Sequence, residues 1–309
     1  MTNPLELDEL LLAPPVETYS WDAVNLPMIR HYCETIGLEN PIYVDEAVAR
    51  VGPYGCIVAP AAMLFSWTMP DYTGRYPKGN PIDPLQETAS RLSRLGFPNV
   101  LAVTLEQQYD RYPRIGERLR KTVNTSAIRG PKKTAVGEGY FITQCSLFEN
   151  EDGERLGQSH LTVLRYRPGA RLPKSSVSTP ASPQLLPDLP PVTIEVTTSF
   201  IVAAAIATRD YEDVHHDRDA AQRAGTKDIF LNILTTIGLV QRCVELWCGP
   251  LTIHESIKLN LLGQAYPGDH LCISADSLKR LDNGRMLIEM KGGHQRGPFC
   301  QAVVIARGQ

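Results

Sequence analysis

An aspartate and a histidine, Asp210 and His215, stand five positions apart, shortly before a long apolar segment. A carboxylate can draw a proton from water, and an imidazole can take up and return a proton near neutral pH. Two such groups on one short loop can hold a single water molecule between them. The spacing therefore predicts acid–base chemistry on water, with Asp210 and His215 as the catalytic pair.

The other charged residues of this loop fit structural roles. His216 follows His215 directly, and consecutive side chains of an extended backbone point to opposite faces, so only one of the two can enter a pocket with Asp210. Asp213 and Asp217 are expected to cap or brace the helix that follows, because aspartate favours N-cap positions. Judged by residue types alone, a loop of this kind is more often solvated than catalytic.

The frame of this loop also occurs earlier in the chain. Residues 40–50, NPIYVDEAVAR, can be laid over residues 212–223, EDVHHDRDAAQR, with Asp45 lying 172 residues before Asp217. At the same separation, Leu38 and Tyr43 stand where the later copy has Asp210 and His215. A loop that only capped a helix could carry the same residues in both copies. The contrast favours catalysis in the second copy alone.

This repeat divides the chain into two globular units. We expect a first unit over residues 1–167 and a second over residues 192–309, joined by a linker rich in Pro and Ser over residues 168–191. Within the first unit, residues 70–99 form a second irregular stretch in which Pro and Gly recur. We interpret this stretch as an insertion near a binding site.

The second unit shows its architecture most clearly. Residues 228–247 are apolar almost all round, which predicts a buried helix that Gly249 and Pro250 end. Four strand-like segments follow, with a hairpin turn at residues 282–284, and they cover 251–262, 269–281, 285–293 and 299–307. A long helix wrapped by a mostly antiparallel sheet is the hot-dog arrangement. Two copies predict an α+β double hot-dog fold, with two long central helices each wrapped by an antiparallel sheet.

The residues of the loop carry a family resemblance. Residues 209–217, RDYEDVHHD, resemble the hydratase-2 motif of MaoC-like proteins, G-D-x-N-P-[LI]-H-x-D, and residues 37–45, GLENPIYVD, keep its frame. The resemblance implies that Asp210 and His215 are catalytic and that the first half lost its pair and accommodates a large acyl tail. The chain also resembles a fusion of the two subunits of bacterial steroid side-chain enoyl-CoA hydratases.

The reaction implied by this resemblance is the addition of water across the C2=C3 bond of a bulky 2-enoyl-CoA, such as a steroid side-chain thioester, to give the 3-hydroxyacyl-CoA. The enolate oxygen that forms needs hydrogen-bond donors, and the first turn of the central helix, around Asn232 and Ile233, offers free N–H groups and a positive dipole end. Two alternatives stay open. One is a hot-dog thioesterase or acyl-carrier-protein dehydratase, and the other is a non-catalytic acyl-CoA-binding or assembly protein.

Composition narrows the partners. The 309 residues carry a net charge of −3 with acidic and basic groups interspersed, which argues against nucleic-acid or anionic-membrane binding. No apolar run is long enough to span a bilayer and the first residues do not resemble a signal peptide, so we expect a cytoplasmic protein. The seven cysteines are dispersed without a CxxC pair, so no metal site is expected and no cofactor is implied. An acyl-CoA thioester is the expected partner. By analogy with other hot-dog proteins, we also expect a homodimer.

Overall fold

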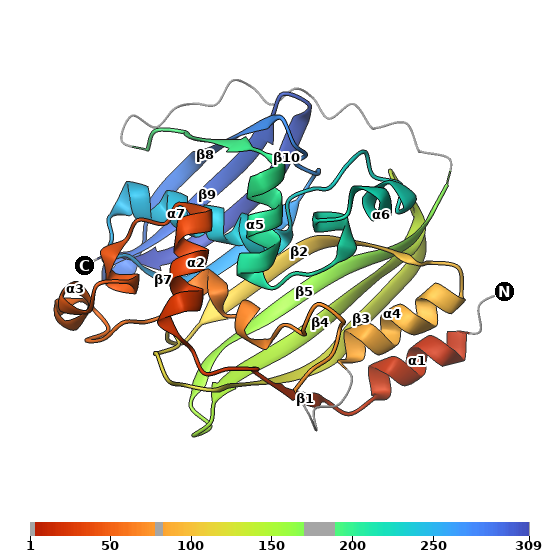
Figure 1. Ribbon diagram of the computed structural model, residues 1–309, viewed down its shortest axis with the longest axis horizontal. Helices are drawn as coiled ribbons and strands as arrows, with labels where there is room; N and C mark the ends of the chain where they lie inside the picture. Colours follow the sequence, from red (N-terminus) through yellow and green to blue (C-terminus); the bar gives the residue numbers. More distant parts are fainter. Residues whose placement is uncertain (1–3, 78–82, 170–188, 309) are drawn as a thin grey trace.

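One antiparallel sheet of ten strands runs through the molecule (Figure 1). The computed structural model describes residues 4–77, 83–169 and 189–308. The order of the strands across the sheet is β1-β3-β4-β5-β2-β7-β10-β9-β8-β6. The strands are β1 (Val16–Tyr19), β2 (Asn99–Tyr109), β3 (Leu119–Thr134), β4 (Gly137–Asn150), β5 (Arg155–Pro168), β6 (Val192–Val196), β7 (Ile253–Leu261), β8 (Asp269–Arg280), β9 (Arg285–His294) and β10 (Gly297–Arg307).

Helices cover one face of this sheet. In Figure 1, α2 and α5 lie side by side in front of α7, and α1 and α4 lie together near the end of the sheet formed by β3 and β1. Within the described residues the α-helices are α1 (Pro4–Leu12), α2 (Leu26–Ile36), α3 (Glu46–Val51), α4 (Pro84–Arg94), α5 (Thr198–Thr208), α6 (Arg218–Arg223) and α7 (Ile233–Cys248). Short 3₁₀ turns are η1 (Pro41–Tyr43), η2 (Ala61–Met63), η3 (Ser66–Thr68), η4 (Asp213–His215) and η5 (Asp282–Gly284).

The two halves of the chain meet at the centre of the sheet. Strands β1 to β5 come from the first half and β6 to β10 from the second, and the antiparallel pairing of β2 with β7 joins them. At this junction the Thr104 hydroxyl donates to Oδ1 of Asn260 over 3.0 Å. This is the double hot-dog arrangement that the sequence predicts. Residues 170–188, most of the expected linker, lie outside the described residues.

The internal repeat is confirmed element by element. At a separation of 172 residues, α2 matches α5, η1 matches η4 and α3 matches α6. Both α2 and α5 end at a residue in the left-handed conformation, Gly37 with φ 71° and Arg209 with φ 57°. Asp45 and Asp217 cap α3 and α6 by accepting backbone N–H bonds through their carboxylates. The two halves therefore present the same loop in the same local geometry.

The central helices differ between the halves. In the second half α7 is a regular helix of 16 residues, and the expected start at residue 228 moves to Ile233 because Asn232 caps it. In the first half the expected long helix is replaced by the turns η2 and η3. Pro60 occupies the position of Asn232 and offers no side-chain cap, and Pro70 disfavours helical backbone in the residue before it. The first central segment is therefore short.

The stretch over residues 70–99, expected to be irregular, contains a regular helix. Asp83 caps α4 by accepting the N–H of Leu85 at 2.8 Å, and the last residues of the stretch begin β2. The carboxylate of Asp83 also accepts from the Lys121 ammonium of β3 at 2.8 Å, with both side chains buried. This ion pair fastens α4 to the sheet. The stretch is therefore a packed part of the first half.

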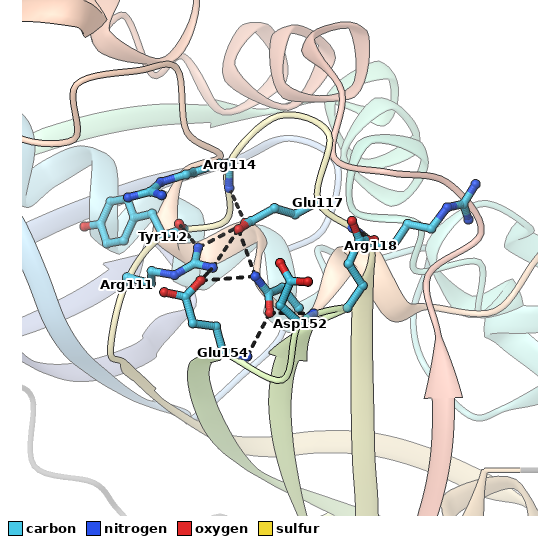
Figure 2. A network of polar contacts seen from close by, with 9 residues as sticks. Arg111, Tyr112, Arg114, Glu117, Arg118, Asp152 and Glu154 are labelled. Atoms are coloured by element: carbon cyan, nitrogen blue, oxygen red, sulfur yellow. Dashed lines mark hydrogen bonds and ion pairs between the residues drawn. The ribbon is translucent and has the colours of Figure 1, made fainter.

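A polar network holds the turn between β2 and β3 (Figure 2). The Arg111 guanidinium donates to Glu117 and to Glu154 at 2.6 Å each, and Glu117 accepts the backbone N–H of Arg114 at 2.7 Å. The chain beside Arg114 forms a β-bridge with Val58, two residues before η2 begins its approach to the sheet. The charges of this network neutralise one another. Its role is to fix the turn and the segment that leads into η2.

Candidate active site

The end of α5 sets the position of Asp210. Arg209 adopts the left-handed conformation there, which turns the chain sharply, and the backbone N–H of Asp210 donates to the Ala205 carbonyl over 3.0 Å. The same turn ends α2 at Gly37, where glycine adopts this conformation without strain. The carboxylate of Asp210 is thereby fixed at the mouth of the loop. Only 8% of this residue is exposed.

The turn η4 sets the position of His215. Its Nδ1 lies 2.7 Å from the carbonyl oxygen of Phe230, and its ring meets the Phe230 ring edge to face with centroids 4.9 Å apart. A carbonyl oxygen only accepts, so Nδ1 carries the proton and donates. In the neutral imidazole this leaves the lone pair of Nε2 free to accept a proton. The ring orientation is fixed for that task.

The structure brings Asp210 and His215 together. Nε2 of His215 lies 3.7 Å from Oδ2 of Asp210, and both residues are buried. This separation is longer than a direct hydrogen bond, but one oxygen atom can lie about 2.8 Å from both atoms at once. The arrangement can therefore hold a single water molecule between a carboxylate and an imidazole, which is the geometry that acid–base chemistry on water requires.

Asn232 and Ile233 lie at the start of α7, as the sequence predicts. The Asn232 side chain accepts the N–H of Thr235 at 2.7 Å and donates to the Thr208 hydroxyl at 2.9 Å, so its amide is occupied by the helix cap and by α5. The first N–H groups of a helix have no partner within the helix. The backbone N–H of Ile233 is therefore the better candidate for a substrate oxygen, and Asn232 holds it in place.

The neighbouring acidic and basic residues lie on the outside of the loop. His216 is exposed, and its Nε2 lies 3.8 Å from Oδ1 of exposed Asp213. Asp217 accepts the N–H of Ala220 at 3.0 Å and caps α6, and this backbone hydrogen bond lowers the pKa of its carboxyl. These three residues therefore have the structural places that the sequence indicates for them.

Glu212 is a further charged residue of the site that sequence reasoning did not single out. Its side chain reaches solvent, but protein atoms crowd its carboxylate, and this desolvation together with repulsion from Asp210 raises its pKa. The charges of His215 and of Arg165 on β5 act in the opposite direction. Arg165 belongs to the first half of the chain, so the loop of the second half lies close to the sheet of the first. No local sequence signal could have indicated this.

Comparisons with known proteins agree with the fold and the loop. Residues 20–158 match the family model described as the FAS1-like dehydratase domain region. The chain is 41% identical over 116 residues to the beta subunit of 3-oxo-4,17-pregnadiene-20-carboxyl-CoA hydratase of Mycobacterium tuberculosis, a match that covers 38% of this chain and 89% of that one. The chain belongs to the MaoC-like hot-dog family of hydratases and dehydratases.

The other half of this MaoC-like chain has a different relative. It is 39% identical over 147 residues to the alpha subunit of the same M. tuberculosis hydratase, covering 48% of this chain and 46% of the relative. The chain thus spans about half the length of the alpha subunits it matches. It resembles a fusion of the two subunits.

Solved structures support the fold of this MaoC-like chain. A MaoC-like dehydratase is similar with a TM-score of 0.70 at 18% identity, covering 95% of this chain and 98% of that one. An M. tuberculosis protein described as having a double hotdog fold is similar with a TM-score of 0.60 at 12% identity, and 97% of each chain is covered. Across the described ranges, no helix has the length and apolar character needed to span a membrane.

The first copy of the MaoC-like loop has become a polar anchor for α7. Tyr43, at the position of His215, donates its hydroxyl to Glu245 of α7 at 2.7 Å, and Asn40 donates to the other carboxylate oxygen at 2.6 Å. Gln241 donates to both Tyr43 and Glu245, at 2.9 Å and 2.8 Å. Leu38, at the position of Asp210, is buried and apolar. The first copy can therefore bind α7, but it lacks the acid–base pair.

Proposed function

We propose that this protein is an enoyl-CoA hydratase that adds water across the C2=C3 bond of a bulky 2-enoyl-CoA and releases the 3-hydroxyacyl-CoA. The observation that carries the proposal is the buried pair of Asp210 and His215, with Nε2 and Oδ2 3.7 Å apart. The names of the relatives add the substrate class, since both are subunits of a hydratase for a steroid side-chain CoA thioester.

The chemistry follows from the hydrogen bonds of the pair. His215 donates through Nδ1 to Phe230, so Nε2 can accept a proton from a water that Asp210 also holds. The water oxygen bonds to C3, the π electrons of the double bond move toward C2 and the thioester oxygen, and the pair returns a proton to C2. The N–H of Ile233 at the positive end of α7 stabilises the charge on that oxygen. Run backwards, the same steps dehydrate a 3-hydroxyacyl thioester.

The proposal assigns different tasks to the two halves. Residues 192–309 carry the catalytic pair, residues 1–167 accommodate the acyl tail, and residues 168–191 connect them. The partner is an acyl-CoA thioester. A cytoplasmic location and a homodimer remain predictions, and light scattering on the purified protein tests the second. The edges available for pairing are β1 and β6, which lie at the two ends of the sheet.

Substitution of the pair tests the function. Asp210→Asn and His215→Gln should each lower kcat for a steroid-type 2-enoyl-CoA by about 10²- to 10⁴-fold, because each removes a proton-transfer group. Hydration is measured as loss of enoyl-thioester absorbance. His216→Gln is the matched control, since the neighbouring histidine is exposed, and it should retain activity within about twofold.

Two outcomes would contradict the proposal. Full activity in both folded variants would remove Asp210 and His215 from the chemistry. Release of free CoA thiol by the unaltered protein would indicate a thioesterase instead, and tight binding of enoyl-CoA without turnover would indicate a binding protein.

A further inference from the structure

Buried polar side chains line the inner face of the sheet in the first half. Gln107 of β2, Ser159 of β5 and Ser146 of β4 stand directly opposite one another on adjacent strands, and each is at most 1% exposed. On the same face, one row further along, Thr125 of β3 pairs with Gln144 of β4, and both are buried. We call Gln107, Ser159 and Thr125 the polar row.

The polar row has hydrogen-bonding capacity that the described residues do not use. Nε2 of Gln107, Oγ of Ser159 and Oγ1 of Thr125 find no partner among the described residues. On η3, which packs against β3, Oγ of Ser66 and Nε1 of Trp67 are likewise buried and unpartnered in that part of the chain. Burying such groups without a partner is costly, so native structures rarely do it. An amide or indole N–H can only donate, and the partner that these groups require is therefore an acceptor.

The charge around the polar row is balanced. Lys121 precedes Thr125 on the same face of β3, but its ammonium is paired with Asp83 at 2.8 Å, and Gln144 donates to the same carboxylate at 2.9 Å. A carboxylate or phosphate would find no unpaired cation there to offset its desolvation. The surroundings favour a neutral oxygen, such as that of a ketone.

The second half lacks such a row. The face of its sheet that packs on α7 carries Ala275, Met290, Ala302 and Leu259 opposite one another on β8, β9, β10 and β7. All four are buried and apolar. Polar side chains beneath the central segment are thus a property of the first half and not of the repeated fold.

The polar row lies at a distance from the catalytic loop. Arg165 of β5 is close enough to Glu212 to affect its pKa, and six residues separate Arg165 from Ser159 along the strand, roughly 20 Å at the usual rise. Between them, Val163 and Leu161 face the interior. An acyl group that enters from the loop therefore meets an apolar surface first and polar groups at the end.

We propose that the polar row binds a ketone oxygen at the end of the acyl group farthest from the thioester, with Gln107, Ser159 and Thr125 as donors. The inference rests on the proposed function and deepens it. The substrate class is a multi-ring 2-enoyl-CoA whose terminal ring carries a neutral carbonyl, and the polar row selects this class over a hydrocarbon of the same shape.

Matched substrates test the polar row. Two steroid-type 2-enoyl-CoA thioesters, one with a ketone on the terminal ring and one without it, are compared with crotonyl-CoA, which is too short to reach the row. The unaltered protein should favour the ketone in kcat/KM. Thr125→Val and Ser159→Ala should each lower that preference by about 2- to 10-fold, the value of one neutral hydrogen bond, without changing kcat/KM for crotonyl-CoA. Thr143→Val, on the outer face of β4, is the control and should leave the preference unchanged.

Calorimetric binding of the saturated analogues of both steroid thioesters separates this inference from the proposed function, because binding needs no turnover. A protein without hydratase activity that still binds the ketone analogue more tightly, and loses this preference in Thr125→Val, would sustain the polar row and refute the function. A preference for the ketone that is absent, or that both inner-face variants retain, would overturn the inference. Altered melting temperature without altered preference would show that the row holds only internal water.

Discussion

At the scale of single residues, two short contacts decide what this loop can do. The bond from His215 to the Phe230 carbonyl selects the tautomer in which Nε2 can accept a proton, and the turn at Arg209 places the Asp210 carboxylate beside it. Tyr43 shows the opposite result of the same backbone geometry, because its hydroxyl is directed to Glu245. A change of two side chains on one loop therefore separates a catalytic copy from a structural one.

Glu212 gives a prediction at this scale. Its carboxylate interacts with both Asp210 and His215, and a neutral amide in its place makes proton loss from the catalytic groups easier. We expect Glu212→Gln to move the profile of kcat/KM against pH toward lower pH while activity at the optimum is largely kept. Asp213→Asn, in the exposed part of the same loop, is the control. A profile that moves equally in both variants would assign the effect to general surface charge.

At the scale of elements, the start of α7 ties the site together. Asn232 caps α7 and donates to Thr208 near the end of α5, and the backbone N–H of Phe230 donates to Val214 in η4. Three segments that are separate in the sequence, the end of α5, the loop with η4 and the first turn of α7, are held in one arrangement. The substrate oxygen and the water can then meet fixed groups.

Asn232→Ala tests this junction. We expect a loss of about 1–2 kcal/mol in the free energy of unfolding from the missing cap, measured by urea unfolding, together with a lower kcat because the first turn of α7 shifts against the loop. Thr197→Ala is a matched control, since Thr197 caps α5 with a bond of 3.0 Å to the N–H of Phe200 away from this junction. If both variants lost the same stability and neither lost activity, Asn232 would be an ordinary cap.

At the scale of the whole molecule, two devices hold the halves together. The β2–β7 pairing makes one sheet from two, and the anchor formed by Asn40 and Tyr43 grips Glu245 and Gln241 on α7 from the other half. Burial raises the pKa of the Glu245 carboxyl above its ordinary value of 4.5, although its three donors act against this. The anchor therefore couples the assembly of the two halves to pH.

The sign of this coupling gives a whole-molecule prediction. Because the pKa of Glu245 is higher in the folded state than in the unfolded state, its contribution to stability is full at pH values below 4.5 and is lost as pH rises through the raised pKa. We expect Glu245→Gln to cost most stability at low pH and progressively less as pH rises, in urea unfolding over a pH series. Glu39→Gln, an exposed change beside the anchor, should show no such trend. A difference between Glu245→Gln and the unaltered protein that stays constant with pH would exclude the coupling.

The sequence by itself determined the features that depend on near neighbours. The spacing of Asp210 and His215, the caps at Asp45 and Asp217, the repeat at 172 residues and the helix and strands of the second half follow from local periodicity and capping. Only the tertiary structure decided what distant segments share. It shortened the first central helix, brought Tyr43 to Glu245 across 202 positions and aligned Gln107 with Ser159 and Ser146 in one buried row. Capping and helical periodicity act over a few residues, whereas strand register and burial are fixed only when the whole sheet closes over its core.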